Sequence, residues 1–449
     1  MSWQQQVFGP MAERTMANAQ RRHLVCCYDL SRDSRLAAAI VAEVNRVLDQ
    51  EERRRGVWRV RPGELLLRTH RGPLVLPLRT DEDLGRVLAG ERFDHVRRDV
   101  LDRCTQAYRA LFPDASVGQT AAFLRCVWAG RGPRGTTASP LHGPRTKRPW
   151  PTKKADADPS GAALAQRDAD RGARRIDRDP PRPAHQSDTY AKLIHYLGTQ
   201  AGIPPAVQEA LVTELAAIRA RCAPRITTLA SGQMPLVAMH VDAGRSLWQQ
   251  SRHQPMAPTL VSVLADGEGR LLRHQPPTTY QAFLELAGQR MARVLVEAYA
   301  QDGLLSYTEL QWVFLASAET VSRALDHHQR THQVVLPCPG TVLDMGRMLT
   351  HKRLIVRLHL QGHTVLEIAR ATWHHPRSVD AYLKAFDAVL ILYLYGLPPR
   401  LIASVLGRGE SLIAEYLELI AAYLNDPETM RDHLRQRGVK IPAQISNSG

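Results

Sequence analysis

Histidine is the residue of this sequence best suited to chemistry, because its 18 histidines include several close neighbours. Grouped imidazoles hold transition metals when carboxylates or thiolates complete the ligand set. Neighbouring histidines on a helix point to different faces, and the sequence offers no cysteine or carboxylate that completes a set. We therefore predict polar surface histidines, no metal and no cofactor. The groups are His327, His328 and His332, then His351 and His359, then His374 and His375.

Three carboxylates lie near predicted strands, where a recombinase-type enzyme would place the ligands of its catalytic metals. They are Asp242, Asp266 and Glu268, and nothing in their spacing fixes them as one site. The sequence also lacks the GxxxxGK[ST] phosphate loop, the HExxH and GxSxG motifs, and cysteines with zinc spacing. We predict no catalytic residue. A transposase or recombinase-type enzyme that uses carboxylates of the α+β modules remains the alternative function.

Contacts with nucleic acid are the other chemistry that the sequence supports. Residues 362–383 and 396–417 repeat one apolar pattern. A helix-turn-helix needs a small residue where its helices cross and a branched apolar residue about ten positions later. Both stretches meet this need, with Ile368, Ala369, Val379 and Tyr382 in the first and Ile402, Ala403, Ile413 and Tyr416 in the second.

The turns of these two units contain different residues. Thr364 and Glu367 have the spacing of a capping box at the start of the first unit. Gly407 of the second unit suits a positive φ in the turn, whereas Trp373 occupies that place in the first. The first turn should therefore have another geometry or carry strain.

A further helix-turn-helix is predicted over residues 303–337, ahead of these two. Ser317 is expected to cap its second helix, although Gln311 stands where a small residue is usual. The sequence QVVLPCPGTVLD that follows could form a small β-wing. The core spacing is supplied by Leu310, Phe314, Val321 and Leu325.

The exposed residues of each unit indicate whether it contacts DNA. Cationic side chains bind phosphates, and arginine pairs with guanine. Glu410, Glu415 and Glu418 would repel phosphates, so the last unit is expected to be structural or dimerising. A helical scaffold without DNA contact remains possible. The predicted DNA-binding residues are Thr320, Ser322, Arg323 and Arg330 in the first unit, and His374, His375, Arg377, Ser378 and Lys384 in the second.

Charge and cysteine use indicate the partner and the compartment. The net charge of +15 favours a polyanion, although an arginine-rich genome would give the same excess. Six cysteines without a CxxC pair are typical of a reducing cytosol. No apolar run approaches the ~18 residues of a membrane span, and the first residues lack the order of a signal peptide. We expect a cytoplasmic, nucleoid-associated protein with no membrane partner.

The helices and strands that would position these residues can also be predicted from the sequence, and together they indicate an α+β fold that is mainly α. Apolar periodicity predicts helices over 34–55, 93–111, 116–129, 188–201, 205–222 and 279–300. Strands are expected within 59–78, 232–241 and 257–274, the last with a Gly-rich hairpin at 266–269.

These elements group into modules. Residues 131–186 contain nine prolines and thirteen Lys/Arg against six Asp/Glu, a composition that cannot bury a core. The predicted order is a flexible N-terminus (1–22), a small N-terminal α+β module (23–130), a disordered basic linker (131–186), a middle α+β module (187–302), tandem helix-turn-helix units (303–345, 346–387 and 388–425) and a tail (426–449).

The two α+β modules have related sequences. LAAAIVAEVNRV (36–47) aligns without gaps with VQEALVTELAAI (207–218), and PGELLL (62–67) aligns with SGQMPL (231–236). We predict that the N-terminal module is a diverged copy of the middle one. Chance similarity between amphipathic patterns is the alternative.

From about residue 187 to 424 the chain resembles a prokaryotic family known only as the domain of unknown function 1670. The segments that carry the resemblance include ASGQMPLVAMHVDAG, GLLSYTELQWVFLASAETVSRAL and GTVLDMGRMLTHKRLIVRLHLQGHTVLEIARAT. The resemblance implies a helix-turn-helix C-terminal half, of the kind found in transposon-encoded DNA-binding proteins and regulators. It brings no activity with it, and the usual turn glycine is absent at Leu315 and Trp373.

The sequence therefore predicts a homodimeric protein that binds duplex DNA sequence-specifically, as a regulator or as an accessory factor of a mobile element.

Overall fold

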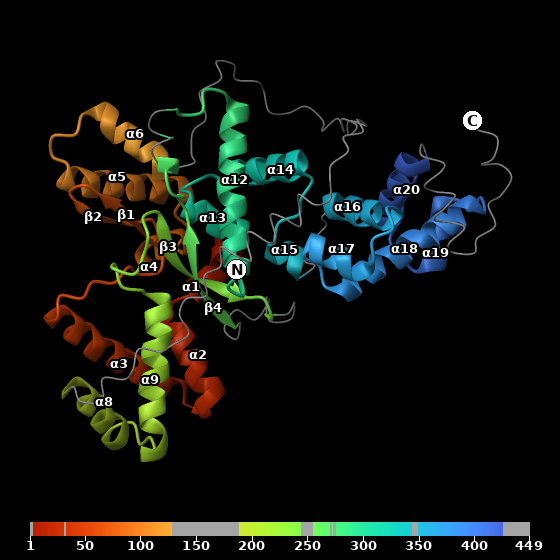
Figure 1. Cartoon of the computed structure of the whole chain (residues 1–449). Helices are drawn as coiled ribbons and strands as arrows, with labels where there is room; N and C mark the ends of the chain where they lie inside the picture. The colour runs from red at the N-terminus through yellow and green to blue at the C-terminus, as the bar shows by residue number, and fades with distance from the viewer. Residues whose placement is uncertain are drawn as a thin grey trace. The chain divides into compact units, whose positions relative to one another are not determined.

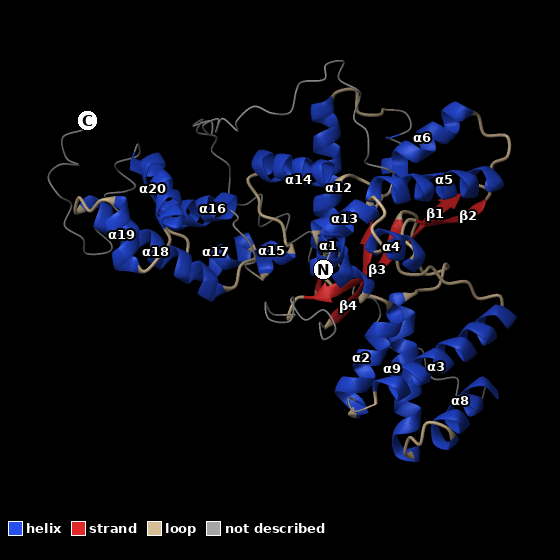
Figure 2. Cartoon of the chain, turned by 180° about the vertical axis from the view of Figure 1, so that it is seen from behind, coloured by secondary structure: helices blue, strands red, loops and turns tan. Residues whose placement is uncertain are grey.

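The computed structural model describes residues 3–30, 33–127, 188–243, 255–269, 272, 275–343 and 349–424. The predicted linker (131–186) and tail (426–449) lie outside these residues. The described part is α+β and mainly α, as predicted, with small antiparallel sheets among many helices (Figures 1 and 2). It forms two compact units, Met1–Gln333 and Val334–Gly449, and each is described here by itself.

The first unit holds both α+β modules and the first helix-turn-helix. Its elements are α1 (Trp3–Ala12), α2 (Met16–Tyr28), α3 (Ser34–Arg54), β1 (Glu64–Thr69), β2 (Gly72–Pro77), α4 (Asp81–Leu88), α5 (Phe93–Leu111), α6 (Val117–Val127), α8 (Asp188–Thr199), α9 (Pro205–Cys222), β3 (Gln233–His240), β4 (Met256–Ser262), α12 (Tyr280–Tyr299), β5 (Gly303–Leu304), α13 (Tyr307–Val313) and α14 (Ala318–His332).

The two α+β modules share one hydrophobic core instead of forming separate domains. Helix α2 packs on α3 and α9, while α8 packs on α9 and α3, so two helical hairpins interlock (Figure 1). Leu24, Ile40 and Val44 of the N-terminal module are fully buried against Leu197 and Leu215 of the middle module. The boundary predicted at residue 187 is therefore not a boundary between folded bodies.

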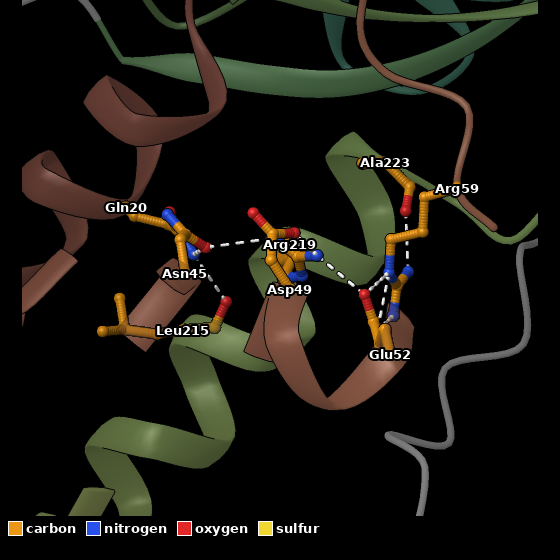
Figure 3. A network of polar contacts seen from close by, with 8 residues as sticks. All are labelled: Gln20, Asn45, Asp49, Glu52, Arg59, Leu215, Arg219 and Ala223. Atoms are coloured by element: carbon orange, nitrogen blue, oxygen red, sulfur yellow. Dashed lines mark hydrogen bonds and ion pairs between the residues drawn. The ribbon is translucent and has the colours of Figure 1, made fainter. Parts of the chain in front are cut away.

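A polar network joins α3 to α9 at the edge of this core (Figure 3). The guanidinium group of Arg219 on α9 is buried and donates to Asp49 and to Glu52, the latter at 2.7 Å. Arg59 also donates to Glu52 and, at 2.7 Å, to the carbonyl oxygen of Ala223. Burial raises the pKa of the Glu52 carboxyl, but the hydrogen bonds from Arg59 and Arg219 outweigh it and hold the pKa below its usual value.

The backbone supports the predicted duplication of the module. The sequence alignment pairs Gly63 with Gly232 and Leu66 with Pro235. In the structure the amide of Gly63 donates to the carbonyl of Pro235 at 3.0 Å, and the amide of Gly232 donates to the carbonyl of Leu66 at 2.7 Å. The two bonds are equivalent, because replacing each residue by its counterpart in the other module converts one bond into the other. Two subunits related by a two-fold axis make contacts of this reciprocal kind.

The segments that follow the strands are also alike. Asp83 accepts from the backbone of Thr80 at the start of α4 and pairs with Arg103 of α5 at 2.6 Å. Glu268 accepts from the backbone of Ala265 and pairs with Arg293 of α12 at 2.8 Å. The Gly-rich hairpin predicted at 266–269 is wrong, because this segment is the counterpart of the first turn of α4.

The sheets are short and antiparallel. Strand β1 pairs with β2 from Glu64 opposite Pro77 to Thr69 opposite Gly72. Strand β3 lies between β4 and β5, so β4 is an edge strand among the described strands of this sheet. The backbone bonds from Gly63 to Pro235 and from Gly232 to Leu66 bring the two sheets together, so one small β layer lies between the interlocked helices on one side and α5 and α12 on the other.

The prediction of a flexible N-terminus is wrong. Helix α1 buries Phe8 and Met11, and Phe8 stacks on Phe93 of α5 with ring centroids 5.9 Å apart. Arg14, which is 2% exposed, pairs with the buried Glu309 of α13 at 2.7 Å. These contacts join residues far apart in sequence, so local composition did not reveal them.

The second unit is helical. Its elements are α15 (Pro339–Val342), α16 (Leu349–Leu360), α17 (Val365–Thr372), α18 (Pro376–Leu394), α19 (Pro399–Leu406) and α20 (Glu410–Leu424). The predicted β-wing is wrong for the described residues 334–343, which form a segment without regular secondary structure, then α15 and a turn. Prolines 337 and 339 cannot donate to a sheet, and the carbonyl of Val335 accepts from the indole of Trp373 instead.

Gly232 and Gly267 offer a matched test of the close packing at Gly232, because their φ values are both positive, +86° and +78°. A Cβ at Gly232 would clash with the carbonyl oxygen of Leu264, whereas a Cβ at Gly267 would meet nothing within 4 Å. We expect Gly232→Ala to lower the free energy of unfolding by about 3 kcal/mol. Gly267→Ala should lower it by about 1 kcal/mol, the cost of the positive φ alone. Urea unfolding followed by circular dichroism measures both, and equal losses would contradict the steric explanation.

Candidate nucleic-acid interface

The second predicted helix-turn-helix is a three-helix unit made of α16, α17 and the first half of α18. The residues predicted to form its core do so, because Ile368, Ala369 and Val379 are buried together and Tyr382 packs against them. Thr364 caps α17, and the Glu367 carboxylate accepts from the backbone amide of Thr364 at 2.7 Å. The capping box predicted from the sequence is therefore present.

The turn of this unit has the same geometry as the turn of its repeat. Trp373 has φ = +58° and Gly407 has φ = +59°, so the turn does not differ in geometry, and the other of the two expected outcomes, strain, applies. The expected strain is there, because a left-handed conformation is costly for a bulky residue. The Trp373 indole donates to the carbonyl of Val335 at 2.9 Å, which helps to hold this conformation.

The second and the last helix-turn-helix units share the helix α18. The N-terminal half of α18 buries Val379 and Leu383 against α16 and α17. Its C-terminal half buries Phe386 and Leu390 against α19 and α20. The core of the last unit is the predicted one, made of Ile402, Ala403, Ile413 and Tyr416.

Of the five DNA-binding residues predicted in the second unit, three are exposed on or beside α18. Arg377 lies in the first turn of α18 and makes no ion pair within the described part of the chain. His375 precedes it, and its Nδ1 accepts from the Arg377 amide at 3.2 Å. Lys384 pairs with Asp380 at 2.7 Å, but its side chain is 74% exposed. Ser378 is half-buried.

His374 is a correction, because it belongs to the core and is only 6% exposed. Its Nδ1 lies 2.7 Å from the carbonyl oxygen of Thr372, and its ring meets that of Tyr382 edge-on. The left-handed turn at Trp373 directs the next side chain inward. Helical periodicity could not show this, because His374 precedes the helix.

The four residues predicted in the first helix-turn-helix lie on α14 in the first compact unit. Ser317 caps α14 as predicted, and its hydroxyl lies 2.9 Å from that of Thr320. Thr320 and Ser322 are half-buried. Arg323 is exposed but pairs with Glu319 and with the Tyr280 hydroxyl at 3.3 Å, and Arg330 donates to the backbone of its own helix.

The predicted core of this first unit is confirmed. Leu310, Phe314, Val321 and Leu325 are all fully buried. Leu315, in place of the usual turn glycine, has φ = +46°. The turn is thus left-handed in all three units, whichever residue occupies it.

The acidic face expected on α20 is smaller than predicted. Glu410 and Glu418 are exposed, but Glu415 pairs with Lys352 of α16 at 2.9 Å. The Lys352 ammonium also lies 5.8 Å from the ring centre of Tyr382 and 5.9 Å from that of Tyr416. Glu415 therefore stabilises the contact between α16 and α20.

The three carboxylates considered for catalysis have other surroundings. Glu268 pairs with Arg293 and caps a turn. Asp242 is exposed beside His240, and Asp266 is exposed in a turn. No group of metal-ligand type within the described residues includes any of the three.

One group of possible ligands was missed at the sequence level. Glu285 of α12 lies beside His328 and His332 of α14, and one donor atom from each falls within 4.8 Å of the others. The sequence argument held that no carboxylate completes a set with these histidines, and the structure supplies one. The four-residue spacing of the two histidines was the available signal, while Glu285 is more than forty residues away.

Comparison with known proteins agrees with the resemblance. The family described as "Protein of unknown function (DUF1670)" matches residues 204–419. These residues form a domain of that family. The DUF1670 domain runs from the start of α9 into α20, so it includes all three helix-turn-helix units and leaves out α1 to α8. No curated protein and no solved structure matches the chain. No helix among the described residues is both long and apolar enough to cross a membrane.

The different positions of His374 and Arg377 can be tested by their effects on stability. We expect His374→Ala to lower the free energy of unfolding by about 1–3 kcal/mol, because it removes a buried hydrogen-bonding group and leaves a cavity. Arg377→Ala should leave stability unchanged, because the side chain is exposed and has no ion-pair partner among the described residues. Urea unfolding followed by circular dichroism, with each transition fitted separately, makes the comparison. A stable His374→Ala variant would contradict the core assignment.

Proposed function

We propose that this protein binds duplex DNA through the N-terminal half of α18, as a sequence-specific regulator or a mobile-element accessory factor. The observation that carries the proposal is the state of Arg377. It lies in the first turn of the second helix of a helix-turn-helix and is exposed, with no carboxylate partner in the described part of the chain. Such a residue can pair with guanine in the major groove.

The repeat supplies an internal comparison for this assignment. Superposing the cores, with Val379 on Ile413, sets Arg377 against Ser411 and Lys384 against Glu418. Both units keep the same core and the same turn, yet only one keeps cations on the second helix. Because fold alone needs neither cation, their presence in one copy favours a role in binding phosphates and base edges.

The remainder of the chain contributes charge. The net charge of +15 attracts a polyanion over long distances. Thirteen Lys/Arg against six Asp/Glu in residues 131–186 add phosphate contacts without sequence preference. A cytoplasmic, nucleoid-associated location follows from this proposal.

We also propose that the chain forms a homodimer through the last unit. Leu401 and Val405 stand one turn apart on α19 and are 48% and 58% exposed, and Tyr395 after α18 is 66% exposed. Leu401 and Val405 share one face of α19, and exposed apolar residues grouped in this way are typical of an interface. A dimer would present two copies of α18 to successive half-sites.

Arg377→Ala should weaken binding to a selected duplex by about 1–3 kcal/mol and relax discrimination at one base position. Arg46→Ala is the control, because it removes the same charge from α3. It should cause only a small, salt-dependent loss of affinity and leave specificity unchanged. Glu410→Ala should leave specificity intact. Fluorescence anisotropy on selected and scrambled duplexes, repeated over a salt series, reports these effects.

The same series tests the electrostatic part, since log affinity should fall by about 0.9 per phosphate contact for each tenfold rise in salt. Absence of binding at low salt, or equal effects of Arg377→Ala and Arg46→Ala on selectivity, would contradict the proposal.

Val405→Asp should convert the dimer into a monomer, because a carboxylate would be placed in an apolar contact. Val117→Asp is the matched control, since Val117 on α6 is 77% exposed and lies outside the proposed interface. Light scattering after size exclusion gives the mass of each variant. A monomeric wild type, or a dimer that survives Val405→Asp but not Val117→Asp, would overturn this assignment.

A further inference from the structure

Helices α12 and α14 pack unusually closely because of one glycine. A Cβ on Gly288 of α12 would lie 2.6 Å from the carbonyl oxygen of Ala324 and 2.8 Å from the Cβ of His328. Only glycine allows this approach, which brings the side chains of α14 down onto α12. Glu285, three residues before Gly288, is on the same face of α12.

Three side chains meet where the helices approach. The Glu285 carboxylate lies 2.9 Å from Nε2 of His332, and the rings of His328 and His332 have centroids 4.4 Å apart. His328 and His332 are four residues apart on α14, so both face α12. One donor atom from each of the three side chains lies within 4.8 Å of the others.

One ring nitrogen of His328 lacks a hydrogen-bond partner. Both oxygens of Glu285 are engaged by other histidines, one by His332 and the other by His327 at 2.9 Å. The Nδ1 atom of His328 is buried and has no hydrogen-bond partner within the described residues. An orphaned ring nitrogen beside a carboxylate and a second imidazole needs a further group.

We propose that Glu285, His328 and His332 bind a divalent transition-metal ion of the zinc type. Two imidazoles and one carboxylate suit Zn²⁺, and three protein ligands leave one position for water or another ligand. Bonds of about 2.0–2.2 Å to the metal would replace the direct 2.9 Å contact between Glu285 and His332, and would draw the more widely spaced donor atoms closer together. His327 stands next to the carboxylate, where it orients Glu285 or completes the coordination.

The ion would clamp the C-terminal end of α14 to α12. Helix α14 is the second helix of the first helix-turn-helix, and the metal would fix that end by bonds between two helices. Metal binding does not depend on the proposed DNA contact through α18, which lies in the other compact unit.

The test uses the full chain, stripped with a chelator and dialysed. Titration with Zn²⁺ by calorimetry should show one more equivalent bound to the wild type than to the triple variant Glu285→Gln, His328→Ala, His332→Ala. Each single substitution should weaken this equivalent by at least about tenfold. Co²⁺ in place of Zn²⁺ should give visible absorption typical of a four-coordinate site, and the triple variant should lose it.

His195→Ala is the matched control, because His195 is an exposed histidine of α8 outside the group. It should keep the full equivalent and the Co²⁺ spectrum. Glu285→Gln keeps the test valid if a histidine variant fails to fold, since it preserves side-chain size. Equal Zn²⁺ uptake by the wild type and by folded Glu285→Gln, or Co²⁺ absorption that survives in that variant, would overturn the proposal.

Discussion

Burial of one arginine between two helices constrains the whole first unit. Arg219 is 4% exposed on α9, and Asp49 and Glu52 on α3 are the carboxylates that compensate its charge (Figure 3). A buried cation without its partners costs several kcal/mol, so α9 and α3 cannot separate while the core remains dry. Residues 34–54 and 205–222 are thus locked together across a long stretch of sequence. This requirement explains why both α+β modules fold as one body.

Features that are determined by residues close together in the sequence could be predicted, whereas features that depend on distant contacts could not. The bounds of α5 and α9 were predicted to the residue, because apolar periodicity and a proline at the start of α9 are local signals. The cap at Thr364 and the positive φ of Gly407 are equally local. The burial of His374 and the pairing of Arg14 with Glu309 depend on contacts made only after folding. The group around Glu285 depends on Gly288, whose role appears only when α14 lies against it.

The repeated helix-turn-helix has a structural consequence that the repeat alone does not show. Because α18 ends one unit and begins the next, the two units cannot move as separate bodies without breaking that helix. The helix therefore packs against a different pair of helices at each end, and the end that packs on α16 and α17 is the one that carries the exposed Arg377 and Lys384. The two units differ mainly in their exposed residues. Ile368 and Ala369 in the core of one unit correspond to Ile402 and Ala403 in the other, whereas the exposed Lys384 corresponds to Glu418.

The duplicated modules bear on how the protein assembles. Reciprocal contacts, in which Gly63 bonds to Pro235 while Gly232 bonds to Leu66, are typical of a symmetric dimer interface. Here both halves belong to one chain, so that interface is already occupied and is free to diverge. It has diverged, because α12 leads into a helix-turn-helix whereas α5 leads into α6, and the buried pair of Arg14 and Glu309 joins α1 to α13. A second copy of the chain would therefore need another surface, and the exposed apolar residues of α19 are suited to that role.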